Sequence, residues 1–256
     1  MLQALPQCPG KQEKGNRREA RPLNIIELKG VEKQYHSKTA LSGIDMSIGE
    51  GDSVTVFGPN GAGKTTLLKI ISGLMQATRG KAFYNNKVYP ESDIKKEVFY
   101  LGHKTALYNA LTVQENINFI CRLFSLNHRG ESIENALRDH GLWERRMDPV
   151  NELSQGMKKR LALAKGFITN PEVFILDEPF TGLDLGWRSS VLSKIKNIRK
   201  QGKSVVISTH LVEEGYALAD RVAFLHKGKL LFIKKKEEAE IGEIYSLFDS
   251  LGENIR

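Results

Sequence analysis

Residues 53–74 read SVTVFGPNGAGKTTLLKIISGL and carry the strongest structural signal in the chain. The β-branched run 53–57 predicts a buried strand, which passes through several glycines into a segment whose apolar residues follow helical spacing. This segment is expected to form a helix that stops near Gly73 and has its apolar side at Leu67, Leu68, Ile71 and Leu74. A strand, a glycine-rich loop and a helix in this order are the structural context that a phosphate-binding loop requires.

The loop itself, GPNGAGKT at 58–65, matches the pattern G-x-x-x-x-G-K-[ST]. Backbone N–H groups can turn inward around a triphosphate only where Cβ atoms are absent, which accounts for the glycines. Lys64 offers a mobile positive charge to the β- and γ-phosphates, Thr65 offers a hydroxyl to Mg²⁺, and the start of the helix adds partial positive charge. The alternative is a glycine-rich turn with a solvated lysine. We expect a nucleotide site built from Gly58, Pro59, Asn60, Gly61, Ala62, Gly63, Lys64, Thr65 and Thr66.

A second acidic site follows an apolar run in FILDEP at 174–179. Asp177 stands at the carboxyl end of that run, where ligands of open α/β sheets bind, and is expected to hold Mg²⁺ together with Thr65. Asp177 already fills the metal-binding role, so Glu178 is not needed for it. Glu178 is therefore the candidate general base for a water that attacks the γ-phosphate, and the alternative is a solvated loop acid.

The rest of the chain predicts an α/β fold with two additions. Short apolar runs at 173–176, 204–208 and 221–225 are separated by helical stretches, which is typical of a largely parallel, buried sheet. Upstream of residue 53, alternating apolar positions broken by Gly and Asp predict an N-terminal layer of short antiparallel strands. Residues 105–165 predict a mostly helical insertion, with a capping box at Thr112 and Glu115 and an apolar stripe at Ile117, Ile120, Cys121 and Phe124.

Composition narrows the class of protein. The 256 residues are 40% hydrophobic and carry a net charge of +8, which fits a globular chain with a full core and excludes collagen-like or wholly disordered chains. The excess of basic residues suggests nucleic acid or an anionic membrane surface as a partner. Residues 1–22 hold five basic and two acidic residues, so +3 of the charge belongs to a segment expected to be disordered.

No uncharged apolar stretch approaches the roughly 18 residues that a membrane span needs, so work at a membrane would need a partner. The first 22 residues lack the apolar region of a secretory signal, and the chain is expected to stay in the cytosol. Cys8 lies in the polar tail and Cys121 in the helical pattern, which predicts two thiols rather than a disulfide or a metal site.

Five motifs follow one another along the chain: GPNGAGKTT, ELSQGMKKRLALAKGF at 152–167, ILDEP, GLD at 182–184 and STH at 208–210. Together they make the chain resemble the ATP-binding cassette (ABC) family from about residue 24 to 232. The resemblance implies a P-loop NTPase core of the RecA-like type, with the N-terminal antiparallel β layer and the inserted α-helical subdomain. It also implies ATP and Mg²⁺ as cofactors, and a dimer in which two cassettes sandwich two ATP molecules head to tail.

The LSQG segment suits such a dimer. Ser154 is expected to cap the following helix, so its hydroxyl, the Gly156 N–H and the helix N-terminus form an anion site with no phosphate loop of its own to serve. A second subunit, expected to be an identical chain, must then supply the phosphate. The alternative is an ordinary N-cap. The family's usual LSGGQ is changed at Gln155 and Met157, which we interpret as subfamily variation.

Three further positions match family residues. Tyr35 matches the aromatic that stacks on adenine, and the alternative is a surface tyrosine on an edge strand. Asp184 follows Leu183 in the family's inter-subunit loop. His210 matches the histidine that contacts the γ-phosphate and positions water, and the alternative is a satisfied polar residue at a strand end.

The most informative departure from the family is His103, within YLGHKTALYNALTVQENI at 100–117. The family has a glutamine here that touches Mg²⁺ and the attacking water. An imidazole can still share a hydrogen bond but titrates near neutral pH, so nucleotide sensing is expected to depend on pH. The alternative is a histidine that only packs in the loop. The YLGH form resembles the haem exporter ATPases of bacterial cytochrome c maturation.

The resemblance implies a transport motor that hydrolyses ATP on the cytoplasmic face of the inner (plasma) membrane and drives separate permease subunits, with haem export as the candidate activity. The expected organisation is a tail at 1–22, an ATPase domain at 23–235 with a helical subdomain at about 104–165, and a helical extension at 236–256.

The alternative function is that of a soluble ABC ATPase that acts on ribosomes or nucleic acid. Such proteins usually fuse two cassettes or insert long coiled coils, and the sequence shows neither, so we do not expect nucleic acid as a partner. A small-molecule kinase built around the same phosphate loop would not need the LSQG segment.

Overall fold

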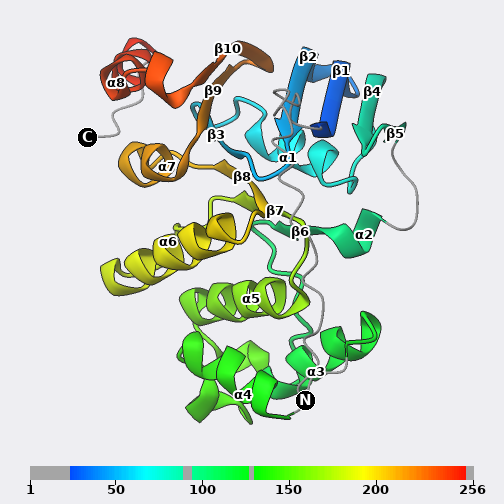
Figure 1. Ribbon diagram of the computed structural model, residues 1–256, viewed down its shortest axis with the longest axis vertical. Helices are drawn as coiled ribbons and strands as arrows, with labels where there is room; N and C mark the ends of the chain where they lie inside the picture. Colours follow the sequence, from blue (N-terminus) through cyan, green and yellow to red (C-terminus); the bar gives the residue numbers. More distant parts are fainter. Residues whose placement is uncertain (1–23, 89–93, 127–129, 252–256) are drawn as a thin grey trace, which may run out of the picture.

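The computed structural model describes residues 24–88, 94–126 and 130–251, and these form two β-sheets with helices beside and below them (Figure 1). The segment 1–22 with Cys8 lies outside the described residues, so the prediction of a disordered tail stays a prediction. Within the described ranges no helix is long and apolar enough to cross a membrane.

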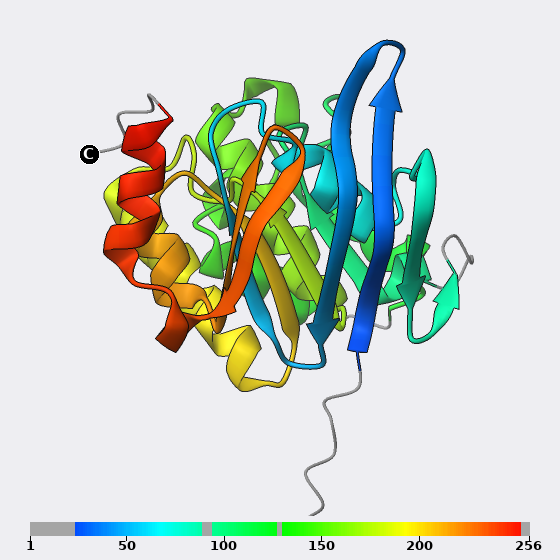
Figure 2. The same ribbon diagram turned by 90° about the horizontal axis from the view of Figure 1, so that it is seen from above.

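The smaller sheet has the order β2-β1-β4-β5, and the four strands span Asn24–Tyr35 (β1), Lys38–Gly49 (β2), Arg79–Tyr84 (β4) and Lys87–Val88 (β5). Its pairings are antiparallel, which confirms the predicted N-terminal layer. The prediction of short strands was wrong, because β1 and β2 run for 12 residues each and stand as two long arrows in Figure 2. Gly43, with φ 63, lies at a shift in the β1–β2 register, so this glycine marks a bulge and not a strand end.

The larger sheet has the order β10-β9-β3-β8-β7-β6. Its strands span Ser53–Phe57 (β3), Val98–Leu101 (β6), Val173–Asp177 (β7), Ser204–Ser208 (β8), Arg221–His226 (β9) and Lys229–Lys235 (β10). All neighbours pair in parallel except β9 and β10, which form an antiparallel hairpin. Every residue of β3, β7 and β8 is buried, as expected for strands covered on both faces. The predicted parallel α/β core is confirmed.

Helix α1, Lys64–Ile71, packs its apolar side chains into a core that also takes side chains from both sheets. The helix ends at Ile71, with Ser72 as its C-cap, because Gly73 adopts a left-handed φ of 70 that cannot continue an α-helix. Leu74 therefore lies beyond the helix and is 61% exposed. The prediction that Leu74 belongs to the apolar side of the helix was wrong.

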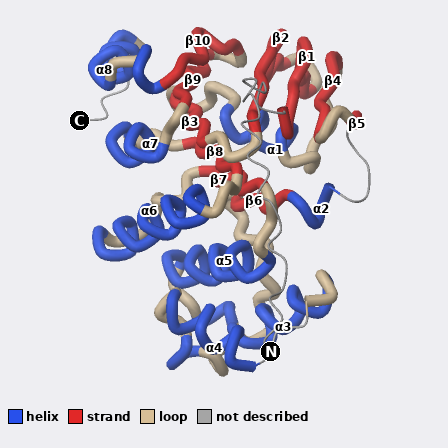
Figure 3. Tube along the Cα trace, in the orientation of Figure 1, coloured by secondary structure: helices blue, strands red, loops and turns tan. Residues whose placement is uncertain are grey.

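The predicted helical insertion contains α3 (Val113–Leu123), α4 (Gly130–Asp139) and the first part of α5 (Gln155–Thr169), together with single turns at Trp143–Arg145 and Val150–Glu152. The capping box is present, since the Thr112 hydroxyl accepts from the Glu115 N–H while the Glu115 carboxylate accepts from the Thr112 N–H. Cys121 is buried and makes no disulfide. Figure 3 shows these helices at one end of the molecule, with the strands gathered at the other.

The remaining helices are α2 (Ile94–Glu97), α6 (Leu185–Lys200), α7 (Val212–Leu218) and α8 (Ile241–Ser250), with a single turn at Lys236–Glu238. Helices α5 and α6 pack against β7 and β8 and form a second core on the far face of the larger sheet. Helix α8 follows the β9–β10 hairpin and buries Ile244 and Phe248 in a cluster with α7. Helices α3, α4 and the first part of α5 form a helical layer, and α5 connects this layer to the larger sheet because it contributes side chains to both cores.

Candidate active site

Four neighbouring parallel strands, β3, β8, β7 and β6, end at the same edge of the larger sheet. The phosphate loop follows β3, Asp177 closes β7, His210 stands two residues after β8, and His103 stands two residues after β6. A cavity of about 860 Å³ lies at this edge, and the predicted residues that line it are Tyr35, Asn60–Thr66, His103, Asp177, Glu178 and His210. The topology thus brings together residues that are far apart in sequence, where α/β sheets bind ligands.

Two glycines of the phosphate loop are required by the close approach of other backbone segments. A Cβ on Gly58, whose φ is 149, would lie 2.1 Å from the carbonyl oxygen of Leu225 in β9. A Cβ on Gly63, whose φ is 107, would lie 2.6 Å from the carbonyl oxygen of Ala40 in β2. No other residue type fits at either position, because a side chain would collide with backbone that cannot move aside.

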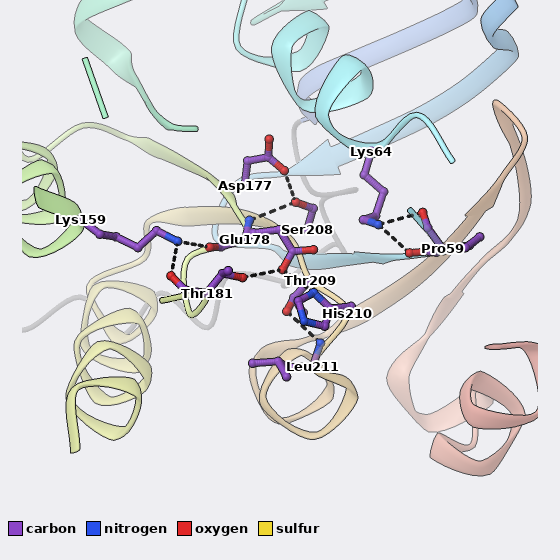
Figure 4. Close-up of polar contacts among 11 residues, drawn as sticks. Pro59, Lys64, Lys159, Asp177, Glu178, Thr181, Ser208, Thr209, His210 and Leu211 are labelled. Atoms are coloured by element: carbon purple, nitrogen blue, oxygen red, sulfur yellow. Dashed lines mark hydrogen bonds and ion pairs between the residues drawn. The ribbon is translucent and has the colours of Figure 1, made fainter. Parts of the chain in front are cut away.

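Lys64 is the first residue of α1 and is buried in the floor of the cavity. Its Nζ donates to the carbonyl oxygens of Gly58 at 2.6 Å and Pro59 at 3.1 Å (Figure 4). The ammonium is thereby held over the loop whose N–H groups and helix N-terminus favour an anion. A phosphate that enters the loop meets a lysine already in position.

Asp177 is buried, and both of its carboxylate oxygens accept hydrogen bonds, one from Ser208 Oγ at 2.5 Å and one from the Tyr100 hydroxyl at 3.2 Å. Burial, and secondarily the Asp177 carboxylate, raises the pKa of Tyr100 far above its ordinary value, so its hydroxyl stays a donor. Thr65 lines the same cavity. Carboxylate and hydroxyl oxygens suit Mg²⁺, which takes few protein ligands and completes its shell with water and phosphate oxygens. Among the described residues, no group of three or more His, Cys, Asp or Glu side chains could bind a metal.

Glu178 is buried and adopts a left-handed φ of 52, a conformation that costs a non-glycine residue of order 1–3 kcal/mol and is found mainly at functional sites. Its N–H donates to the Ser208 carbonyl oxygen at 3.0 Å. Its carboxylate oxygen Oε2 lies 3.0 Å from His210 Nδ1 and 3.4 Å from Thr181 Oγ1 (Figure 4). The carboxylate is therefore oriented from two sides while it lines the cavity.

Lys159 was not predicted from the sequence and lies next to this turn. It comes from α5, is only 9% exposed, and donates from Nζ to the carbonyl oxygens of Glu178 at 2.5 Å and Thr181 at 2.8 Å. Burial lowers the pKa of Lys159 to about 8, while the carboxylates of Glu178 and Asp177 act in the opposite direction. Ser208 and Tyr100 were missed as well, since only the folded chain shows what their hydroxyls contact.

Tyr35 lies at the cavity rim and is 42% exposed, with its hydroxyl 2.9 Å from the Met75 sulfur and the Lys33 ammonium 5.5 Å from its ring centroid. A partly exposed ring held in this way is available for stacking on a base. His103 is exposed on the cavity wall.

Ser154, Gly156 and Asp184 do not line the cavity. Ser154 caps α5, and its hydroxyl accepts from the Met157 N–H at 3.2 Å. Asp184 caps α6, and its carboxylate accepts from the Trp187 N–H at 3.0 Å. Gly156 lies against the turn after Glu178, since a Cβ on it would be 3.0 Å from the Gly182 carbonyl oxygen. Within one chain, these three predicted residues are therefore apart from the phosphate loop.

Comparison with known proteins gives one consistent result. A family model described as ABC transporter matches residues 41–181. The linearmycin resistance ATP-binding protein LnrL of Bacillus subtilis (strain 168) is 32% identical over 84% of this chain and 70% of its own length. The lantibiotic transport ATP-binding protein SrtF of Streptococcus pyogenes is 30% identical over 84% of this chain and 93% of its own length.

Among solved structures, an ATP-binding cassette captured as a dimer in a post-hydrolysis state with ADP and Pi superposes with a TM-score of 0.76. It is 26% identical in sequence, and the match covers 82% of this chain and 98% of that one. The antiparallel layer, the mixed sheet and the phosphate loop described above are thus parts of a known architecture.

Proposed function

Because this chain belongs to the ABC transporter family and is one of its ATPases, we propose that it powers a separate membrane permease by closing with a second copy of itself around ATP. The observation that carries the proposal is the convergence of Lys64, Asp177, Glu178 and His210 on one cavity at the carboxyl edge of the sheet. We place the ATPase unit at 23–235, its helical subdomain at about 104–165 and a C-terminal extension at 236–256.

The residues of this chain divide the work of hydrolysis. The phosphate loop and Lys64 bind and orient the triphosphate, and Tyr35 stacks on the adenine. Asp177 and Thr65 would hold Mg²⁺, which when bound would neutralise charge on the β- and γ-phosphates. Glu178 accepts a proton at its carboxylate from the water that attacks the γ-phosphorus, and His210 orients both that carboxylate and the γ-phosphate. The bond that breaks joins the γ-phosphorus to the oxygen that bridges it to the β-phosphorus. The products are ADP and phosphate.

The second copy is needed because Ser154 and Gly156 lie outside their own chain's cavity. The Ser154 hydroxyl and the N-terminus of α5 offer donors to an anion, and neither Ser154 nor Gly156 lines the cavity of the phosphate loop. In a head-to-tail dimer they would reach the γ-phosphate held by the other subunit, with Asp184 beside the interface. The dimeric structural relative supports this arrangement.

Mixing two inactive variants tests the shared site. Ser154→Arg removes the contact to the other subunit's phosphate, and Lys64→Ala removes nucleotide binding in its own subunit. Each variant alone is expected to be inactive, while a heterodimer retains one intact composite site and regains ATP hydrolysis. The measurement is ATPase activity of mixed subunits, with heterodimers verified by two different affinity tags. Verified heterodimers without activity would favour a site contained in one chain.

The helical layer supports a permease as the partner. Tyr108, Phe119 and Leu123 are exposed large apolar residues, the rings of Tyr108 and Phe119 are in edge contact at 4.7 Å, and Leu123 lies one turn after Phe119 on α3. Such a patch is unusual on a surface that meets only water. Attachment to a permease would place the chain on the cytoplasmic face of the membrane. The alternative, an ATPase acting on ribosomes or nucleic acid, is supported only by the net charge of +8.

Haem is the one cargo that the sequence itself favours, through the YLGH segment at 100–103. The relatives reported above are described by linearmycin resistance and lantibiotic transport. The support for haem export within this proposal is therefore the YLGH segment alone.

His103 is proposed to contact the attacking water or the water around Mg²⁺, in place of the family's glutamine. Substituting His103→Gln is expected to keep ATP hydrolysis within about threefold of wild type, since an amide also offers a donor and an acceptor. The change His103→Ala is expected to lower kcat at least about tenfold, because a lost catalytic hydrogen bond costs about 1.4 kcal/mol or more. Steady-state kinetics at saturating MgATP compares the three proteins. Equal kcat values for His103→Ala and wild type would show that His103 only packs in its loop.

A further inference from the structure

Lys159 is a buried ammonium in the middle of the protein, on the third residue after Gly156 in α5. A charge taken out of water needs partners that replace its hydration, and burial without them is strongly unfavourable. The partners of Lys159 are two carbonyl oxygens, those of Glu178 and Thr181, and both belong to the turn that follows β7 (Figure 4). The nearby carboxylates of Glu178 and Asp177 favour the charged form of the ammonium.

The turn from Glu178 to Thr181 presents the proposed base to the cavity. The Thr181 N–H donates to the Glu178 carbonyl oxygen at 3.4 Å, which is long for a turn hydrogen bond, and Glu178 holds a left-handed φ of 52. The hydrogen bond that closes this turn is therefore weak, and the turn begins at a residue with a strained backbone conformation. Lys159 supplies the missing restraint, because one ammonium bridges the first and last carbonyl groups of the turn.

We propose that Lys159 is a positioning residue for ATP hydrolysis, which holds the Glu178–Thr181 turn so that the Glu178 carboxylate stays beside His210 and faces the cavity. This inference rests on the proposed role of Glu178 as the general base. Lys159 does not line the cavity and so acts through the turn rather than on the nucleotide. Its effect must therefore appear in the chemical step, not in ATP binding.

The kinetic test compares Lys159→Met with Lys165→Met, a matched control. Lys165 lies on the same helix, its pKa is also lowered by burial, and its Nζ donates to a carbonyl oxygen at 2.8 Å, but that carbonyl belongs to Ala106, which does not line the cavity. We expect Lys159→Met to lower kcat at least about tenfold with KM for MgATP changed less than about twofold. The Lys165→Met protein should keep kcat within about twofold. Lys159→Arg, which retains charge and donors, should recover part of the lost kcat.

A double-mutant cycle then separates positioning from general destabilisation. If Lys159 acts only through Glu178, single-turnover hydrolysis by Glu178→Gln and by the double variant Glu178→Gln/Lys159→Met should agree within about twofold. Thermal unfolding and MgATP binding verify that each protein is folded. An independent loss in the double variant would overturn the inference, as would a Lys159→Met protein with unchanged kcat or with only KM raised.

The same experiment distinguishes failure of this inference from failure of the proposed function. Near wild-type hydrolysis by Glu178→Gln alone would overturn the assignment of the base, and the inference about Lys159 with it. Slow hydrolysis by Glu178→Gln together with unchanged kcat in Lys159→Met would overturn the inference alone.

Discussion

Replacing Glu178 by Gln is expected to leave MgATP binding intact while hydrolysis becomes at least about 10²-fold slower, which is the usual contribution of a general base. The amide has the size of the carboxylate and can still contact Thr181 Oγ1, so the turn should keep its shape. What it cannot do is accept the proton of the attacking water at neutral pH. Intact ATP should then accumulate between two subunits, and a stable dimer should appear in size-exclusion chromatography with MgATP.

Glu172→Gln is a suitable control for this experiment. Glu172 stands just before β7, where its half-exposed carboxylate pairs with the largely covered Lys203 ammonium at 2.7 Å, and neither residue lines the cavity. Removing that charge should leave the rate of hydrolysis within about twofold of wild type, because neither Glu172 nor Lys203 lines the cavity. Hydrolysis near the wild-type rate in Glu178→Gln would mean that another group accepts the proton.

Removing the Lys64 side chain is expected to weaken ATP binding at least about 10²-fold. Hydrogen bonds from a charged group are worth about 1.5 to 3 kcal/mol each, and Lys64 is placed to make more than one to the β- and γ-phosphates. In Lys64→Ala the carbonyl groups of Gly58 and Pro59 lose the lysine as a donor, while Pro59 keeps the Ala62 N–H, so thermal unfolding should be measured beside binding. Isothermal titration calorimetry with MgATP gives the affinity directly.

The matched control for Lys64 is Lys69→Ala, in the last turn of the same helix, where the lysine does not line the cavity. Its ATP affinity should equal that of wild type. If Lys64→Ala itself bound ATP with wild-type affinity, residues 58–65 would be a turn rather than a phosphate site.

Most of the fold could be predicted because its signals are local. Glycine spacing, the β-branched run before it and the short apolar runs downstream each report on a few neighbouring residues, and the parallel sheet follows from their order. Two local predictions failed. Leu74 fits the helical spacing, but the neighbouring Gly73 ends α1 before it. Gly and Asp interruptions predicted short strands, but pairing with β1 carries β2 through Gly43 as a bulge.

The same limit applies to the site. Lys64 and Asp177 could be found because a motif fixes their chemistry, and the structure places both on the cavity. Lys159 and Tyr100 carry no such signal, since a lysine in an amphipathic helix and a tyrosine in a strand are ordinary. Their roles depend on carbonyl and carboxylate groups that lie 19 and 77 residues away in the sequence. Periodicity and spacing do not report contacts of that kind.

The packing of the phosphate loop between the two sheets has a consequence for how strongly nucleotide can bind. Gly58 lies against the backbone of β9 and Gly63 against that of β2, and the Gly228 N–H donates to the Ala62 carbonyl oxygen at 2.9 Å. The loop is thus shaped by the sheets on either side before any ligand arrives. Ordering a free loop would cost about 1 to 2 kcal/mol of backbone entropy per residue, and here folding has already met that cost. Nucleotide therefore enters a preorganised cradle whose backbone is already in place.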